Sequence, residues 1–304
     1  MKLFDLHCDT LTELLKDGSN LRETSAVINL SGMQKFEKCV RCFAIWAPDV
    51  LTEKEASEHF DALYGVFQNQ LSLYKNEIVQ ITDKNSLDDG RVGLVLTVEN
   101  GSVLNGNLEK IEDIAKLGVK LFSLTWNSEN SLGFGQLENK GLKPLGKKAV
   151  PILEENGITI DVSHISEKGF YDICEISTKP IVASHSNCKK LCTHNRNLTN
   201  DQISQIIRKK GLIGLNFYYE FLNNNSAKSS AYDLLKHAEH IINLGGEDVV
   251  SIGTDFDGGK MVDGFENDTQ LLSLKEFFIK NGFSENITDK ILFNNANNFF
   301  VNNL

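Results

Sequence analysis

The chain has 304 residues, of which 41% are hydrophobic and 24% are charged, as is ordinary for a globular protein. Its formal net charge of −10 disfavours nucleic-acid binding, because proteins that bind nucleic acids usually carry a basic surface. The first residues do not form a secretory signal, and no apolar run approaches the roughly 20 residues that cross a bilayer. We therefore expect a cytoplasmic protein without nucleic-acid or membrane partners.

Short apolar runs alternate with helix-like stretches along the whole chain. The runs expected to form strands are residues 3–7, 39–46, 92–98, 119–125, 158–163, 180–185, 212–217 and 249–254. Most are continuously apolar, which is typical of strands buried on both faces of a parallel sheet. Eight strands alternating with helices predict an α/β protein with a single (β/α)₈ TIM-type barrel over residues 1–304. A doubly wound open sheet is the alternative.

The stretches between the strands carry helix signals. Thr52 and Glu55 form a capping-box pattern before an amphipathic stripe. Gly157 is expected to end the helix that begins at residue 144, and Pro151 predicts a kink within it.

Several cysteines and histidines have structural explanations. Cys39 and Cys42 form a C-x-x-C pattern, but they lie on a predicted strand and no second such pattern exists. A redox pair places its first cysteine at a helix start, so buried structural thiols are expected here. His59, His237 and His240 lie on predicted helices and are expected to be structural or solvated.

Ionisable side chains follow five of the predicted strands. They are His7 and Asp9 after the first strand, Glu99 after the third, His164 after the fifth, His185 after the sixth and Asp255 after the eighth. In a barrel these strand ends meet on one rim, where active sites lie. Imidazoles and carboxylates without thiolates suit Zn²⁺, and five ligands suit two ions that share a bridging carboxylate.

Each of these residues also has an ordinary explanation when it is taken alone. A histidine at a strand end is usually a hydrogen-bonded structural residue. Asp9 can cap the helix that follows it, and Glu99 can belong to a turn. Cys8, between His7 and Asp9, is expected to face the opposite side of the strand and pack in the core.

Five segments carry a resemblance to a known family. They are DLHCDT at 5–10, TVENG at 97–101, the stretches 141–166 (ending in DVSHIS) and 180–203 (beginning PIVASHS), and GTDFDG at 253–258. On these segments the whole chain resembles the membrane dipeptidase (renal dipeptidase) family of metallo-dependent hydrolases. The resemblance implies a (β/α)₈ barrel, two zinc ions per chain and hydrolysis of dipeptides. Homodimers are common in that family.

The resemblance also implies roles for individual residues. His7 and Asp9 would bind the first ion, His164 and His185 would complete the second site, and Glu99 would bridge the two ions. A hydroxide bridging the ions would then attack the peptide carbonyl.

Two more residues receive roles from the resemblance. Asp255 would act as general base and then protonate the leaving amine. Arg196 would pair with the C-terminal carboxylate of the substrate, which includes L-D dipeptides in many family members. Two alternatives stay open at this point: Asp257 can exchange roles with Asp255, and Arg196 can lie in a polar surface loop.

The chain departs from the family after the fourth predicted strand. Some members have a histidine there that contacts the substrate carbonyl, whereas this chain has Trp126 followed by Asn127. Either side chain can donate one hydrogen bond in place of the histidine. Loss of one such donor can cost roughly 10²–10³ in rate, so the preferred substrate is open.

Two other function classes compete with the dipeptidase. One is a hydrolase of the same fold that cleaves another amide, such as a lactam or an N-acyl amino acid. The other is a barrel that binds metal without catalysis, and the full ligand set with Asp255 argues against it.

Overall fold

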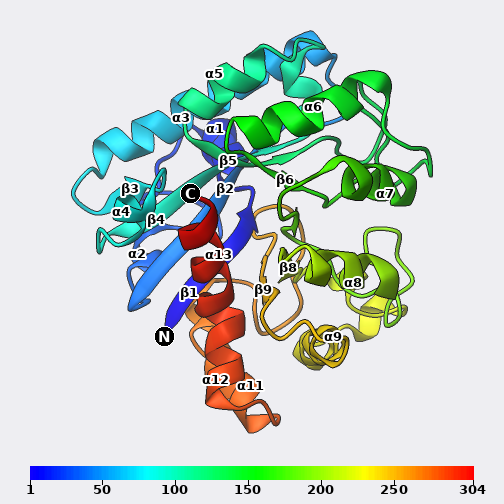
Figure 1. Cartoon of the computed structure of the whole chain (residues 1–304). Coiled ribbons are helices and arrows are strands. Elements are labelled where there is room, and N and C mark those ends of the chain that lie inside the picture. Colours follow the sequence, from blue (N-terminus) through cyan, green and yellow to red (C-terminus); the bar gives the residue numbers. More distant parts are fainter.

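Nine parallel strands form one sheet, and eight of them close into a barrel (Figure 1). The computed structural model describes residues 1–304. The strands are β1 (Lys2–Cys8), β2 (Lys38–Trp46), β3 (Ile78–Gln80), β4 (Val92–Glu99), β5 (Val119–Ser123), β6 (Thr159–Asp161), β7 (Val182–Ala183), β8 (Leu212–Leu215) and β9 (Val250–Ile252). The pairing of β2 with β4 closes the ring, so the open-sheet alternative is wrong. The barrel prediction is confirmed.

All eight predicted strands are present, and β3 is an addition to them. It pairs only with the first residues of β4, outside the ring. Its three residues, Ile-Val-Gln, are too short a run to stand out as a strand in the sequence.

The helices lie outside the barrel (Figure 1). They are α1 (Thr10–Asp17), α2 (Leu30–Met33), α3 (Glu53–Leu73), α4 (Lys84–Leu87), α5 (Lys110–Lys116), α6 (Pro144–Glu155), α7 (Glu167–Ile176), α8 (Asn200–Arg208), α9 (Ala231–Asn243), α10 (Asp268–Leu271), α11 (Leu274–Lys280), α12 (Glu285–Asp289) and α13 (Asn295–Asn303). The Thr52–Glu55 capping box is confirmed. Helix α6 runs on past Pro151, and Gly157 follows its end with a φ of 69°.

The amino-terminal end of the barrel is closed by an apolar cluster. Phe4 and Val40 point into the barrel, and Phe299 and Phe300 of α13 cover them from below. The rings of Phe4 and Phe300 stack at 4.9 Å between centroids. In Figure 1, α13 crosses β1 beside the amino terminus. This cluster leaves the opposite end of the barrel for polar groups.

The predicted structural thiols are buried. Cys39 lies in the cluster between barrel and helices, whereas Cys42 lies in the cluster inside the barrel, so the two thiols face opposite sides of β2. Burial raises the pKa of Cys39 to about 12. Two thiols on opposite faces of a strand, with burial favouring the protonated form, are what structural cysteines require.

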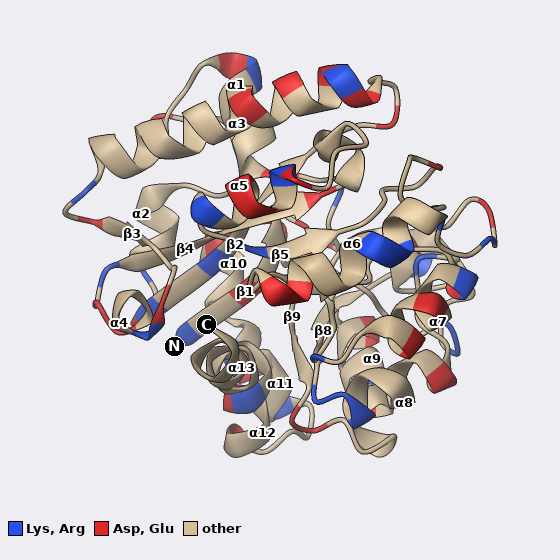
Figure 2. Ribbon diagram, turned by 45° about the horizontal axis from the view of Figure 1, so that its top comes forward, with Lys and Arg blue, Asp and Glu red and all other residues tan.

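Charged residues of both signs are spread over the outer helices and the loops (Figure 2). Acidic and basic segments lie next to each other on α3, in keeping with its predominantly solvent-exposed outer face. No helix is both long enough and apolar enough to cross a membrane.

Candidate active site

A cavity of about 490 Å³ opens at the carboxyl ends of the strands. The predicted site residues in its wall are Asp9, Glu99, Trp126, Asn127, His164, Arg196 and Asp255. His7 and His185 are almost fully buried beside it. The fold therefore brings together all nine side chains that were expected to act in chemistry or binding.

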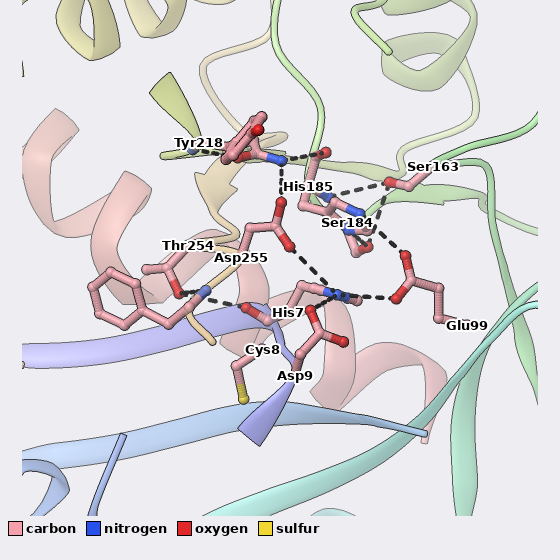
Figure 3. Close-up of polar contacts among 12 residues, drawn as sticks. His7, Cys8, Asp9, Glu99, Ser163, Ser184, His185, Tyr218, Thr254 and Asp255 are labelled. Atoms are coloured by element: carbon pink, nitrogen blue, oxygen red, sulfur yellow. Dashed lines mark hydrogen bonds and ion pairs between the residues drawn. The ribbon is translucent and has the colours of Figure 1, made fainter. Parts of the chain in front are cut away.

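The first donor group surrounds His7 at the end of β1 (Figure 3). Its Nε2 atom lies 3.4 Å from Asp9 Oδ2, 3.5 Å from Glu99 Oε2 and 3.8 Å from Asp255 Oδ1. Cys8, between the two ligands, points away and donates its thiol to the Cys42 carbonyl, as expected for a packing residue.

The second donor group lies on the other side of Glu99. Glu99 Oε1 lies 2.7 Å from His164 Nε2 and 3.6 Å from His185 Nε2, and the two Nε2 atoms are 2.9 Å apart. The groups adjoin, because donor atoms of His7, Glu99 and His185 all lie within 4.8 Å of one another. Each carboxylate oxygen of Glu99 thus faces a different group.

The two histidines of the second group use Nδ1 for contacts within the protein. His164 Nδ1 lies 2.9 Å from Asn127 Oδ1, and His185 Nδ1 lies 2.7 Å from Ser184 Oγ. Histidines that bind metals commonly anchor one ring nitrogen in this way and present the other to the ion. Both Nε2 atoms point toward Glu99.

Two buried atoms of the first group have no hydrogen-bond partner: His7 Nε2 and Asp9 Oδ1. Asp9 does stand at the N-cap position of α1, but its side chain makes no capping hydrogen bond. The capping explanation is therefore wrong. Because buried polar atoms are nearly always paired, these free donor atoms fit a cation of the zinc type.

The electrostatics point the same way. Burial raises the pKa of Glu99 to about 7 and also raises the pKa of Asp255. Burial lowers the pKa values of His164 and His185, so both are neutral imidazoles. Burial also acts to lower the pKa of His7, but the neighbouring carboxylates outweigh it and raise this pKa. A buried group with excess negative charge is stabilised by divalent cations.

The two aspartates after β9 have different surroundings. Asp255 faces the first donor group, with Oδ1 toward His7. Asp257 is turned toward the start of α1 and the loop that follows this helix, and it accepts hydrogen bonds from the Thr10 hydroxyl at 2.7 Å and the Val27 N–H at 2.6 Å. Of the two aspartates, Asp255 is therefore the one that faces His7, as a role beside the donor groups requires.

Asn216, beyond β8, holds Asp255 in place. Its Nδ2 donates to Asp255 Oδ2 at 2.8 Å, while its Oδ1 accepts the Tyr218 N–H at 2.6 Å. The second contact fixes which way the amide points. One carboxylate oxygen of Asp255 is therefore bound and the other is free toward His7.

Arg196 lies inside the site and not on the surface. Only 4% of it is exposed, and it lines the cavity. Its Nη1 donates to Ser186 Oγ at 3.3 Å and its Nη2 donates to the His185 carbonyl at 3.1 Å. Its buried Nε has no partner.

Trp126 and Asn127 line the cavity beside His164. The ring of Trp126 lies 6.0 Å from the ring of His164 and packs edge-on against Trp46 at 5.1 Å. The side-chain oxygen of Asn127 is hydrogen-bonded to His164, so its amide nitrogen is the group that can donate to a substrate.

Some site residues lie outside the predictions. His194 also lines the cavity, and its Nδ1 accepts the backbone N–H of Arg196 at 3.2 Å. Asn216 contacts Asp255, and Ser184 contacts His185. In the sequence, only position could have pointed to such residues: His194 stands two residues before Arg196, and Asn216 follows a strand.

Two of the three histidines expected to be structural or solvated, His237 and His240, make contacts of that kind. His237 is fully buried, accepts the Cys188 N–H at Nδ1 (3.0 Å) and lies 3.0 Å from the Leu222 carbonyl through Nε2. His240 contacts Asn200 on the outside of the barrel.

A parallel barrel with imidazoles and carboxylates gathered at its carboxyl rim defines a metal-dependent hydrolase. The family model of membrane dipeptidases (peptidase family M19) matches residues 1–300. The chain belongs to this family and is a metallopeptidase that acts on dipeptides. The family implies a metal, usually zinc.

The chain is also similar to individual proteins. A metallopeptidase from Rhodobacter sphaeroides, solved with a phosphinate mimic of the dipeptide L-Ala-D-Ala, is 24% identical and superposes with a TM-score of 0.93 over 100% of this chain and 99% of its own. A dipeptidase of family M19, called dipeptidase AC, is 25% identical with the same TM-score, over 100% and 98%. An uncharacterized protein in the PQQ-III 3′ region of Acinetobacter calcoaceticus is 31% identical over 79% of this chain and 89% of its own.

Proposed function

We propose that the enzyme holds two zinc ions at the paired donor groups. His7 and Asp9 would hold one ion, His164 and His185 the other, and Glu99 both. The observation that carries this proposal is the orientation of Glu99, whose two oxygens face the two groups separately. When bound, such ions supply a water of lowered pKa and polarise the peptide carbonyl.

The chain's own residues perform the proton transfers in this proposal. Asp255 lies against the first group with one free oxygen, Oδ1, so it can take a proton from the attacking water. The same oxygen then delivers the proton to the amine that leaves. Asn216 keeps the carboxylate turned toward the reacting atoms during both transfers.

Arg196 would bind the C-terminal carboxylate of the substrate. Its guanidinium lines the cavity and is held at Nη1 and Nη2 by Ser186 and the His185 carbonyl. A fixed guanidinium suits a carboxylate and limits substrates to those with a free carboxylate close to the scissile bond. The Rhodobacter enzyme binds a mimic of L-Ala-D-Ala, and we extend L-D dipeptides to this chain as substrates.

Metal analysis tests the two-ion proposal directly. Protein purified without chelators should contain close to two zinc equivalents per chain. One equivalent or none would contradict the ligand assignment.

The role of Arg196 is tested with a substrate pair. A dipeptide and its C-terminal amide differ only in the carboxylate, and the natural enzyme should prefer the acid. Arg196→Ala should raise KM for the acid by about 10- to 100-fold, since it removes a charged hydrogen bond. Arg196→Lys, which keeps the charge, should lose less. An unchanged KM for the acid would favour the alternative, cleavage of a lactam or an N-acyl amino acid.

A further inference from the structure

A buried aspartate that takes no part in the donor groups lies beneath the second one. Asp161 ends β6 and is 4% exposed. Its Oδ1 accepts the backbone N–H groups of Ser163 at 2.9 Å and Ser184 at 3.0 Å, and its Oδ2 accepts the Ser184 hydroxyl. Both carboxylate oxygens of Asp161 therefore act as hydrogen-bond acceptors.

The hydrogen of the Ser184 hydroxyl is therefore used in the hydrogen bond to Asp161. A serine hydroxyl has one hydrogen to donate, and Asp161 can only accept. The contact of 2.7 Å between Ser184 Oγ and His185 Nδ1 must then run from the imidazole N–H to the serine oxygen. His185 consequently carries its proton on Nδ1 and keeps a lone pair on Nε2, the atom that faces Glu99.

We propose that Asp161 and Ser184 are positioning residues that set the tautomer and the ring orientation of His185 for the second zinc ion. The inference rests on the two-zinc proposal. An aspartate that orients a metal-binding histidine is usually in direct contact with it, whereas here a serine carries the effect across one extra hydrogen bond. Figure 3 shows Ser184 and Ser163 beside the His185 ring.

A neighbouring serine provides a matched control. Ser186 is 1% exposed, as is Ser184. Its hydroxyl accepts a hydrogen bond from Arg196 Nη1, whereas the Ser184 hydroxyl contacts His185. Ser163 Oγ lies 3.4 Å from both hydroxyls. Ser184→Ala and Ser186→Ala thus make the same chemical change at the same depth. The first removes the hydroxyl that contacts the His185 ring, and the second removes the hydroxyl that contacts the Arg196 guanidinium.

Asp161→Asn should reverse the direction of the chain of hydrogen bonds. The amide that replaces the carboxylate would donate to Ser184, whose hydrogen would then turn to His185 Nδ1. That arrangement moves the imidazole proton to Nε2, as in an aspartate-to-asparagine change that leaves a histidine in the wrong tautomer. The isosteric variant should therefore lose more zinc affinity than Ser184→Ala, which only removes the partner.

The experiment measures the stoichiometry and affinity of zinc by competition with a chromophoric chelator. Ser184→Ala should weaken one of the two equivalents by about 10-fold and Asp161→Asn by about 100-fold, while the other equivalent keeps its affinity. Ser186→Ala should keep both affinities and raise KM. Circular dichroism checks folding, and Ser184→Ala decides the matter if Asp161→Asn does not fold.

Two outcomes would overturn the inference, and they are distinguishable. If the natural protein binds two equivalents and Ser184→Ala binds both as tightly, the positioning role of Ser184 and Asp161 is wrong and the two-zinc site stands. If the natural protein binds fewer than two equivalents, the two-zinc proposal itself fails, and the positioning role that rests on it fails too.

Discussion

The two ends of the barrel use the same eight strands for opposite purposes. At the amino-terminal end, inward-facing side chains such as Phe4 pack against the phenylalanines of α13. At the carboxyl end, three carboxylates and three imidazoles gather within a few ångströms, all of them buried except the partly exposed Asp255, and two of their atoms lack a hydrogen-bond partner. The first end stabilises the fold, while the second end costs stability until cations bind. Substitutions at the carboxyl end should therefore lower activity without lowering stability, and substitutions at the amino-terminal end should lower stability without lowering activity.

The largest effect is expected at the carboxyl end, from Glu99→Gln. It removes the carboxylate that faces both donor groups, so kcat/KM should fall by at least about 10³-fold and zinc content should drop. The metal-free variant should be no less stable than the natural protein at pH 8. The folded-state pKa of Glu99, about 7, exceeds its unfolded value, so the ionised form disfavours folding there.

Chelator-treated proteins compared by urea unfolding check this result. Glu112→Gln, at an exposed position on α5, is the control and should change neither activity nor zinc content. A marked loss of stability in metal-free Glu99→Gln would mean that Glu99 also supports the fold.

The opposite pattern is expected at the amino-terminal end, from Phe300→Ala. Phe300 is 3% exposed and stacks on Phe4, so the cavity left by its removal should cost about 3–5 kcal/mol in free energy of unfolding. Activity per folded molecule and zinc content should not change. Ile279→Ala, at a position that is 39% exposed, should cost far less. A fall in kcat for folded Phe300→Ala would show that the two ends are coupled.

A third prediction concerns His237, a buried histidine of α9 that takes no part in the carboxyl-end site. Burial lowers the pKa of His237 to about 4. The folded pKa lies below the unfolded value of 6.5, so the unfolded chain binds more protons between these values. Stability should fall as the pH drops from about 6.5 to about 4, by about 3 kcal/mol from this group. In the folded state, protonation would break the hydrogen bond from the Cys188 N–H.

The check is unfolding by urea at several pH values, read as the difference between His237→Gln and the natural protein. The variant should be less stable at pH 7 and lose less stability on acidification. His240→Gln, at a partly buried position on the outside of the barrel, serves as control. Equal pH dependence in all three proteins would show that His237 carries no such effect.

The sequence predicted the barrel and the residues at its rim because both follow from periodic patterns. Continuous apolar runs mark buried parallel strands, and strand ends place His7, Glu99 and His185 on one rim without knowledge of any distance. The sequence could not predict which oxygen of Glu99 faces which group. That depends on packing between β4 and its neighbours, which no local pattern encodes.

The residues that support the metal ligands and the general base were harder still to predict from the sequence. Ser184 looks like any serine in a strand, and its role depends on Asp161, 23 positions away. Asp255 and Asp257 have the same residue type and spacing in an extended strand. Both instead adopt positive φ angles, 63° and 67°, and the bend sends their side chains to different partners. Backbone geometry of this kind is decided by tertiary contacts.

The smallest effect is expected from Asn216, whose Nδ2 donates to Asp255 Oδ2 at 2.8 Å and to the backbone carbonyl of His185 at 3.3 Å, away from the ring that would bind zinc. Asn216→Ala removes the hydrogen bond to Asp255 Oδ2, worth about 1.5 kcal/mol for an ionised acceptor, so kcat should fall by about 10-fold. KM and zinc content should hold. Asn216→Asp keeps the shape and the acceptor for the Tyr218 N–H but sets a second carboxylate against Asp255, so it should lose more kcat than alanine. Steady-state kinetics with zinc analysis separate these effects. If Asn216→Ala loses zinc in proportion to activity, the asparagine supports the metal ligands. Its proposed role in orienting Asp255 for proton transfer would then be wrong.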